Sequence, residues 1–397
     1  MPPPFRAEHI GSLIRPQMLL DARKAAHIDQ NFQGVSPEIK QATESAISEV
    51  VKQQLSRDVR PLTTGEFERH IFYGGFFENI EGFEIRDLPI PEAFRTNFAP
   101  TALAKKMGHD TRESPIATGK MKRPKSTYMD DWMHLRNLLP EEQWKECKFT
   151  MPPPTQSHIA VKPGMIFTPE SGYTSEKEYF SDLAEIYREE MADLYDAGLR
   201  DIQVDDPYMT FLLADWYLEG LRLDGEDPDD ILDMYIWAHN ECLKRRPADL
   251  HVGIHLCRGN FAGHHFASGS YDRIAKKMFS YLDYDTYYLE YDTERAGGFE
   301  PLKDLPVGKN VVLGVVSTKT PELEDVDECV ARIHEAADVI ANGQGRTRDE
   351  VLRDMGVSPQ CGFGSFSLAQ PMTDDQQWAK LALVRQIAQK IWGNEAK

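Results

Sequence analysis

The feature that most constrains the fold is a regular alternation of short apolar segments with amphipathic helical segments, which is clear from about residue 148 onward. Two earlier apolar segments complete a set of eight. We expect strands at 5–13, 61–67, 148–152, 198–207 (where a helix stop comes first), 251–260, 286–291, 310–316 and 357–362. Eight strands with helices between them, no internal repeat and no Pro/Ser linker predict an α/β fold, the (β/α)8 or TIM barrel.

One long segment does not share this rhythm. Residues 69–146 show little clean periodicity and include a Lys/Arg/Pro-rich piece at 120–125. Long irregular stretches inside a compact domain are usually functional elaborations. We therefore expect one catalytic barrel domain over 1–397, with 69–146 as a subregion inserted after the second strand.

Charge and cysteine usage limit the partners and the compartment. The net charge is −19, from 45 Lys and Arg against 64 Asp and Glu, and such a surface repels nucleic acid and anionic membranes. The five cysteines are odd in number and scattered, which indicates free thiols and a cytoplasmic location. The N-terminus lacks the apolar core of a signal peptide, and no nucleotide-binding glycine motif follows a strand. The sequence leaves open whether copies assemble into a homo-oligomer.

Polar side chains recur where the expected strands end. In a barrel of parallel strands these positions share one face, so residues that are distant in sequence converge there. The set is Ser12, Glu66, Asp205, His255, Cys257, Glu290 and Cys361.

Four members of this set have the chemistry of zinc ligands. His255 and Cys257 are two apart, so on a strand both side chains leave the same face, about 6–7 Å apart. Glu290 and Cys361 end two later strands and complete a His/Cys/Glu/Cys shell. Each residue also has a simpler interpretation: a core His beside a buried Cys, a Glu paired with Arg258 or Arg295, and a small buried Cys. The other three cysteines are better interpreted as structural.

The composition of this shell favours one kind of chemistry. Two thiolates and a carboxylate neutralise a divalent ion, so the ion would be a poor generator of hydroxide. The same shell suits a substrate thiol, which would bind as a nucleophilic thiolate. We therefore expect alkyl transfer to sulfur.

With these motifs, the chain resembles the cobalamin-independent methionine synthases, specifically their C-terminal catalytic barrel and the short single-barrel relatives. The resemblance rests on segments spread from residue 9 to 362: His9–Ser12, Gly65–Arg69, Gln203–Pro207, His255-Leu-Cys257, Glu290 and Pro359-Gln-Cys361-Gly.

The resemblance implies the roles of individual residues. It implies Zn2+ on His255, Cys257, Glu290 and Cys361. It also implies that Ile10, Gly11 and Ser12 bind the carboxylate of homocysteine, and that Glu66 and Asp205 face its ammonium group as the catalytic pair. The implied enzyme makes methionine from homocysteine and a methyl donor.

Two departures from the family concern the methyl donor. The family has a His-bearing loop after the seventh strand, where this chain reads Leu313 to Lys319 without a His. A Trp-rich segment after the third strand is replaced by Pro152 to His158. The donor is therefore left open among a simpler folate, a methylated corrinoid and a small methylated molecule, with Lys319 or His158 as candidate proton donors. The second, N-terminal half of the full-length synthases has no counterpart here.

Two other functions fit the same metal shell. One is a zinc-dependent transferase that adds a thiol to an epoxide, as a coenzyme M transferase does. The other is a barrel with a structural zinc and no catalysis. The presence of both Glu66 and Asp205 favours an amino acid as the thiol substrate.

Overall fold

A six-stranded parallel sheet forms the centre of the computed structural model, which describes residues 3–26, 36–259, 266–366 and 372–393. Neighbouring strands follow chain order, and nearly all their residues are buried, as in parallel sheets covered on both faces. The strands are β3 (Phe149–Met151), β4 (Asp201–Asp205), β5 (His251–Leu256), β6 (Thr286–Glu290), β7 (Asn310–Val316) and β8 (Met355–Pro359). Asn260, at the end of the predicted fifth strand, lies outside the described residues.

Two N-terminal segments complete the barrel. Ala7 forms a parallel bridge with Val357 of β8, and Leu62 forms one with Cys147, next to β3. The two segments are joined to each other by a hydrogen bond from the amide of residue 13 to the carbonyl of residue 65. The fold is thus the predicted α/β barrel.

The first two predicted strands are less regular than expected, because side chains replace part of their hydrogen-bond ladder. The amide of Gln54 binds both the carbonyl and the N–H of Thr63, at 2.8 and 3.0 Å. The ammonium group of Lys148 donates to the carbonyl of His9 at 2.7 Å. A regular strand over 5–13 or 61–67 was therefore a wrong prediction, although the chain does pass through the predicted places in the barrel.

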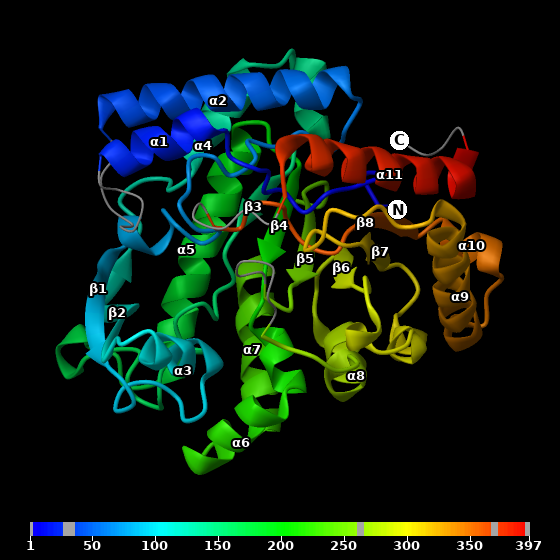
Figure 1. Ribbon diagram of the computed structural model, residues 1–397. Helices are drawn as coiled ribbons and strands as arrows, with labels where there is room; N and C mark the ends of the chain where they lie inside the picture. The colour runs from blue at the N-terminus through cyan, green and yellow to red at the C-terminus, as the bar shows by residue number, and fades with distance from the viewer. Residues whose placement is uncertain (1–2, 27–35, 260–265, 367–371, 394–397) are drawn as a thin grey trace.

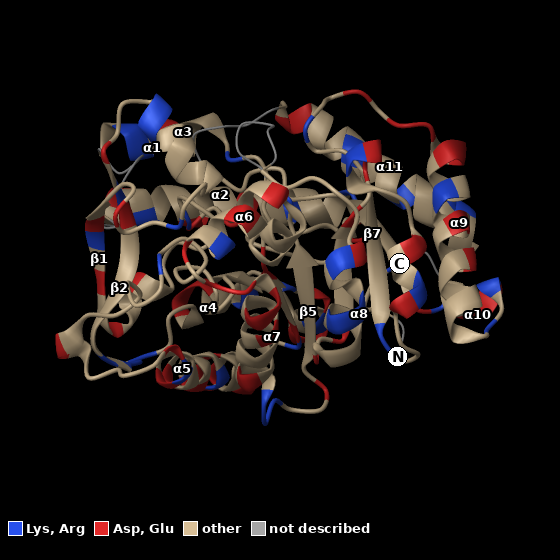
Figure 2. Ribbon diagram, turned by 90° about the horizontal axis from the view of Figure 1, so that it is seen from below, with Lys and Arg blue, Asp and Glu red and all other residues tan. Residues whose placement is uncertain are grey.

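Helices surround the sheet much as predicted (Figure 1). The last helix begins with a capping box, in which Thr373 and Gln376 bind each other's backbone. Between β4 and α7 the chain forms a short 3-10 turn (Met209–Leu213) followed by α6. The helices are α1 (Gln17–Ala25), α2 (Pro37–Ser56), α5 (Glu176–Asp196), α6 (Asp215–Leu223), α7 (Pro228–Leu243), α8 (Asp272–Tyr281), α9 (Val326–Gln344), α10 (Arg348–Leu352) and α11 (Asp374–Trp392). Figure 2 shows acidic and basic residues interspersed on outer helices such as α5, α9 and α10.

The irregular segment 69–146 contains regular structure of its own. Strands β1 (Glu81–Pro89) and β2 (Thr111–Lys122) form an antiparallel hairpin, accompanied by α3 (Ala99–Lys106) and α4 (Met129–Asn137). The hairpin and α3 lie on the opposite side of the molecule from α9 and α10 (Figure 1). Bridges at residues 94 and 117 attach this part to the loop that follows β3. The subregion therefore stands beside one end of the barrel.

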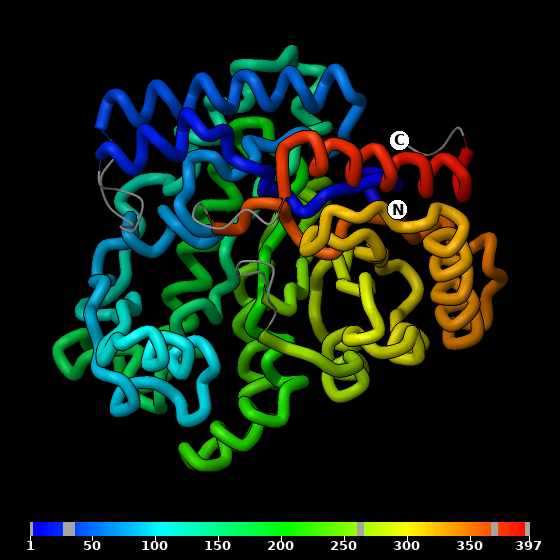
Figure 3. Tube along the Cα trace, viewed as in Figure 1, coloured from blue at the N-terminus to red at the C-terminus, as the bar shows by residue number. Residues whose placement is uncertain are grey.

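The beginning and the end of the described chain pack together, as the trace in Figure 3 shows. The guanidinium group of Arg6 lies 5.5 Å from the ring centre of Trp392 in α11, and it donates to the carbonyl of Met355 at 2.7 Å. Among the described residues, no helix has the length and apolar character needed to cross a membrane.

Candidate metal and substrate site

Four side chains from the ends of three strands of the barrel converge on one point. His255 lies near the end of β5 and Cys257 directly after it, Glu290 ends β6, and Cys361 follows β8. One ligand atom from each of the four lies within 4.8 Å of the other three, and all four residues are buried. The two sulfur atoms are 3.4 Å apart. The fold thus assembles the four residues that the sequence singled out as zinc ligands.

The donor set fits a divalent metal ion. Neither ring nitrogen of His255 has a hydrogen-bond partner among the described residues, although the side chain is buried. A buried polar group without a partner costs about 1–3 kcal/mol, so native structures rarely leave one unsatisfied. Imidazole, two thiols and a carboxylate around one centre are ligands of the type that zinc binds. A zinc ion bound there would supply the partner that His255 lacks.

The acid groups of this cluster compete for ionisation. The hydrogen bond with Cys257 and the nearby ring of His255 hold the pKa of Cys361 well below its usual value. The hydrogen bond with Cys361 and burial raise the pKa of Cys257, and burial raises the pKa of Glu290. Three negative charges at this distance repel one another, and a bound cation removes that conflict.

Glu290 also contacts two arginines, as its alternative interpretation predicted. Its Oε1 accepts a hydrogen bond from the backbone N–H of Arg258 at 3.0 Å, and its Oε2 lies 3.4 Å from the guanidinium group of Arg295. Such outer contacts orient a metal-binding carboxylate, so they do not compete with the ligand role.

A cavity of about 310 Å³ opens from this cluster. It brings together three of the four cluster residues and four of the residues expected to bind the thiol substrate. These are His255, Cys257, Cys361, Ile10, Ser12, Glu66 and Asp205.

Gly11, between two lining residues, does not itself line the cavity. Its amide donates to Nδ1 of His9 at 3.3 Å, and an added Cβ would lie 2.6 Å from Cγ2 of Thr150. With a φ of +124°, the position is one that glycine tolerates far better than other residues. Gly11 thus allows the backbone to turn between Ile10 and Ser12.

Glu66 faces the cavity from an unusual backbone position. Its φ is +60°, its Oε1 accepts a hydrogen bond from the hydroxyl of Thr150 at 2.7 Å, and its Oε2 is buried without a partner among the described residues. Arg69 lies 4.0 Å from the same carboxylate. Burial raises the pKa of Glu66.

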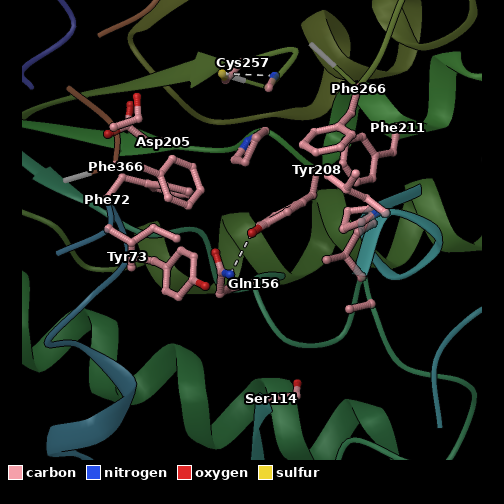
Figure 4. A pocket seen from close by; sticks show the side chains of 18 of the residues that line it. Phe72, Tyr73, Ser114, Gln156, Asp205, Tyr208, Phe211, Cys257, Phe266 and Phe366 are labelled. Atoms are coloured by element: carbon pink, nitrogen blue, oxygen red, sulfur yellow. Dashed lines mark hydrogen bonds between the residues drawn. The ribbon is translucent and has the colours of Figure 1, made fainter. Parts of the chain in front are cut away.

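Asp205, the last residue of β4, lines the same cavity (Figure 4). Its Oδ1 accepts a hydrogen bond from the amide of Gln203 at 2.6 Å. Burial raises the pKa of Asp205 to about 7. Two buried carboxyl groups that lack full compensation favour a cationic ligand group such as an ammonium.

Several aromatic rings line the rest of the cavity, which the sequence did not reveal (Figure 4). The rings come from the start of segment 69–146, from the residue directly before α3 and from the loops after β4 and β5. They include Phe72, Tyr73, Phe98, Tyr208, Phe211 and Phe266. The only sequence signal was the apolar run around Phe72 in an otherwise irregular segment.

The two candidate proton donors occupy different environments. His158 is buried and does not line the cavity, because its ring binds the hydroxyl of Tyr235 at 2.9 Å and the carboxylate of Glu176 at 3.1 Å. Lys319 donates to the carbonyl of Gly259 at 2.7 Å, which lies two residues after Cys257. Of the two, Lys319 is therefore placed near the His/Cys/Glu/Cys cluster.

Comparison with known sequences gives a consistent picture. A family model described as the catalytic domain of cobalamin-independent synthase matches residues 168–390. The Bacillus subtilis (strain 168) protein YxjH, described as uncharacterized, is 31% identical over 98% of this chain and 95% of its own length. The 5-methyltetrahydropteroyltriglutamate–homocysteine methyltransferase of Vibrio vulnificus (strain CMCP6) is 23% identical over 83% of this chain, which spans 35% of that enzyme.

Solved structures agree in fold. A Listeria monocytogenes protein, named as a candidate vitamin-B12 independent methionine synthase, superimposes with a TM-score of 0.71 and 25% identity, covering 99% of both chains. A B12-independent methionine synthase from Shewanella sp. W3-18-1, in complex with selenomethionine, gives a TM-score of 0.68 at 17% identity, covering 98% of both chains.

Proposed function

The chain belongs to the family of cobalamin-independent methionine synthases, and from this premise we propose that it is a zinc-dependent S-methyltransferase whose acceptor is homocysteine or a similar amino-acid thiol. The observation that carries the proposal is the His/Cys/Glu/Cys cluster opening into a cavity that also holds two buried carboxyl groups. A purely structural zinc site would be closed, whereas three of these four residues line a cavity.

In this proposal His255, Cys257, Glu290 and Cys361 hold the zinc ion, which when bound would keep the substrate sulfur in its thiolate form. A carboxylate oxygen is a harder donor than a thiolate sulfur, and zinc accepts soft donors readily. Glu290 is therefore the ligand that an incoming sulfur would most readily displace. Once it has left the zinc ion, the carboxylate of Glu290 would still be bound by the backbone N–H of Arg258 and the guanidinium group of Arg295.

The remaining cavity residues orient the amino acid. Ser12 and the backbone at Ile10 would bind the substrate carboxylate, and Gly11 would provide the turn between them. Glu66 and Asp205 would bind its ammonium group, because both carboxyl groups face the cavity and neither has a full set of partners. Methyl transfer then forms a bond from the thiolate sulfur to the methyl carbon, and the donor keeps the electron pair of the broken bond and takes up a proton.

The proposal also covers organisation and location. We place residues 1–397 in one catalytic barrel, in which segment 69–146 supplies part of the cavity wall. A cytoplasmic location follows from the need to keep Cys257 and Cys361 reduced, and all five cysteines are free thiols.

Metal content tests the proposal directly. We expect about one zinc per purified chain by mass spectrometry of the metal, since four buried ligands of zinc type meet at one point. Cys361→Ala should lose most of that zinc. Cys329→Ala, which removes a buried cysteine on α9, should retain it. An unchanged zinc content in Cys361→Ala would remove the basis of the proposal.

Product analysis then separates the enzymatic alternatives. Incubation with homocysteine and methylated donors should give methionine, identified by mass. If the protein forms a thioether only from a thiol and an epoxide, it is the coenzyme M-type transferase. If it binds zinc but alkylates no thiol, the zinc is structural.

A further inference from the structure

The ring of His239 reaches from α7 to the loop that follows β4. Its Nε2 lies 3.0 Å from Oδ2 of Asp206, and its Nδ1 lies 2.8 Å from the hydroxyl of Tyr284. All three side chains are almost completely buried. An imidazole that binds a carboxylate through Nε2 carries a hydrogen on that nitrogen, and the partner of the other nitrogen fixes the orientation of the ring. The ring of His239 is therefore held at both nitrogens.

The carboxylate of Asp206 holds the start of the loop after β4. Its Oδ1 accepts hydrogen bonds from the backbone N–H of Tyr208 at 2.7 Å and from that of Met209 at 2.9 Å. Met209 is the first residue of a 3-10 turn, and Tyr208 and Phe211 of this loop line the cavity (Figure 4). Because one oxygen binds the loop and the other binds the imidazole, the orientation of this carboxylate sets where the loop lies.

The same loop binds the backbone of two proposed zinc ligands. The backbone N–H of Asp206 donates to the carbonyl of His255 at 2.8 Å. The hydroxyl of Thr210, which is completely buried, lies 2.7 Å from the carbonyl oxygen of Cys257 and 2.9 Å from that of Pro207. Contacts of this kind orient metal ligands, and their loss typically weakens metal binding by about 10–100-fold. The loop thus connects the imidazole on α7 to two ligand residues at the end of β5.

We propose that His239 is a positioning residue of the site, which fixes Asp206 and through it the loop that orients His255 and Cys257. The inference rests on the proposed function, because it assigns an outer support to the same zinc centre. A histidine that only stabilised the barrel would, on removal, lower the stability and leave the metal affinity unchanged. The two roles therefore differ in zinc affinity, which is measured without turnover.

Competition with a chelator, on the purified full chain, measures this affinity. His239→Leu lacks both ring nitrogens, and we expect it to bind zinc about tenfold more weakly or worse. His239→Gln places an amide N–H near the position of Nε2, so it should bind zinc within about threefold of the unmodified protein. Tyr284→Phe removes only the hydroxyl that holds Nδ1, and it should weaken zinc binding about threefold.

Thr210→Val tests the connection through the loop. It keeps the shape of the side chain, removes the hydroxyl beside the carbonyl of Cys257, and should weaken zinc binding about threefold. Combined with His239→Leu, the total loss should be smaller than the product of the two separate losses, because both changes act through one loop. Leu194→Ala is the control for lost stability alone, since Leu194 is buried on α5 shortly before β4 begins. It should keep the zinc affinity of the unmodified protein.

The inference is overturned if His239→Leu and Tyr284→Phe bind zinc as the unmodified protein does, or if His239→Gln restores nothing. It is also overturned if Leu194→Ala weakens zinc binding as much as His239→Leu. If His239→Leu does not fold, Tyr284→Phe and Thr210→Val provide the same comparison. An unmodified protein without zinc would overturn the proposed function and this inference with it. Zinc bound equally by all variants would overturn only the inference, so the two failures are distinguishable.

Discussion

At the scale of single residues, burial decides how the carboxyl groups of the site behave. Asp205 is an ordinary strand-end aspartate in the sequence, yet its burial on the cavity wall raises its pKa to about 7. Its partner Gln203 leaves most of the carboxyl group free for a ligand. The charge available to bind an ammonium group therefore changes near neutral pH.

This predicts a pH-dependent affinity for the amino-acid thiol. Because the pKa of Asp205 is raised to about 7, the group is largely protonated at pH 6 and ionised at pH 8. An ammonium group binds the ionised form, so the KM for homocysteine should fall as the pH rises from 6 to 8. Asp205→Asn should raise KM about tenfold at pH 8 and change it little at pH 6.

Steady-state kinetics at both pH values measures the effect. Asp249→Asn, at an exposed position away from the cavity, serves as the control. If the pH dependence of KM were the same in Asp205→Asn and in the unmodified protein, Asp205 would not bind the ammonium group.

At the scale of elements, the contact between β7 and β8 determines where Cys361 lies. The register between these strands shifts after Gly314, and a Cβ added at Gly314 would lie 2.4 Å from Cα of Gln360. Gln360 directly precedes Cys361, so this close approach sets the position of one proposed ligand. A glycine on one strand thus determines where the Cys361 side chain, which follows another strand, is placed.

Gly314→Ala should displace the segment after β8. Relief of the clash should cost about 1–3 kcal/mol of unfolding free energy. It should also weaken zinc binding about tenfold or more, because small displacements of a ligand disrupt the coordination geometry. Chelator competition measures zinc affinity, and denaturant titration measures stability.

Gly119→Ala provides the comparison, since an added Cβ there meets only Cα of Gly82, at 3.6 Å. It should bind zinc as the unmodified protein does. Equal zinc affinities in the two variants would show that the β7–β8 contact does not position Cys361.

At the scale of the whole molecule, the barrel encloses groups that resist ionisation. Burial and the nearby Lys148 lower the pKa of His9 to about 3. Its Nε2 is 2.7 Å from the carbonyl of Pro61, so the ring joins the two N-terminal segments of the barrel in its neutral form. In the unfolded chain the same ring takes up a proton below about pH 6.5.

The folded protein should therefore lose stability as the pH falls. Because the pKa of His9 is lowered on folding, its contribution is complete above about pH 6.5 and declines by about 1.4 kcal/mol per pH unit as the pH falls toward 3. His9→Gln cannot titrate, so between pH 6.5 and 4.5 it should lose about 2–3 kcal/mol less than the unmodified protein.

Denaturant unfolding at the two pH values gives these differences. His109→Gln, at an exposed position, should lose as much stability as the unmodified protein. An equal loss in His9→Gln would show that this ring does not couple folding to protonation.

The sequence by itself determined the barrel and the grouping of the four side chains that are proposed to bind zinc. The spacing of apolar residues along a strand or a helix shows which side of that element is buried. Parallel strands of a barrel have their C-terminal ends on one face. These two facts were sufficient to bring His255, Cys257, Glu290 and Cys361 together, as the structure does.

Only the tertiary structure decided the parts that depend on contacts between distant segments. The ring of His158 is occupied by Tyr235 and Glu176, and the backbone of Thr63 is bound by the side chain of Gln54. In segment 69–146, strand β1 is without buried residues and therefore lacks an apolar period, yet the segment supplies Arg112 and much of the aromatic wall. The spacing of apolar residues indicates which face of a segment is buried. The partner of each buried group depends instead on how the whole chain packs.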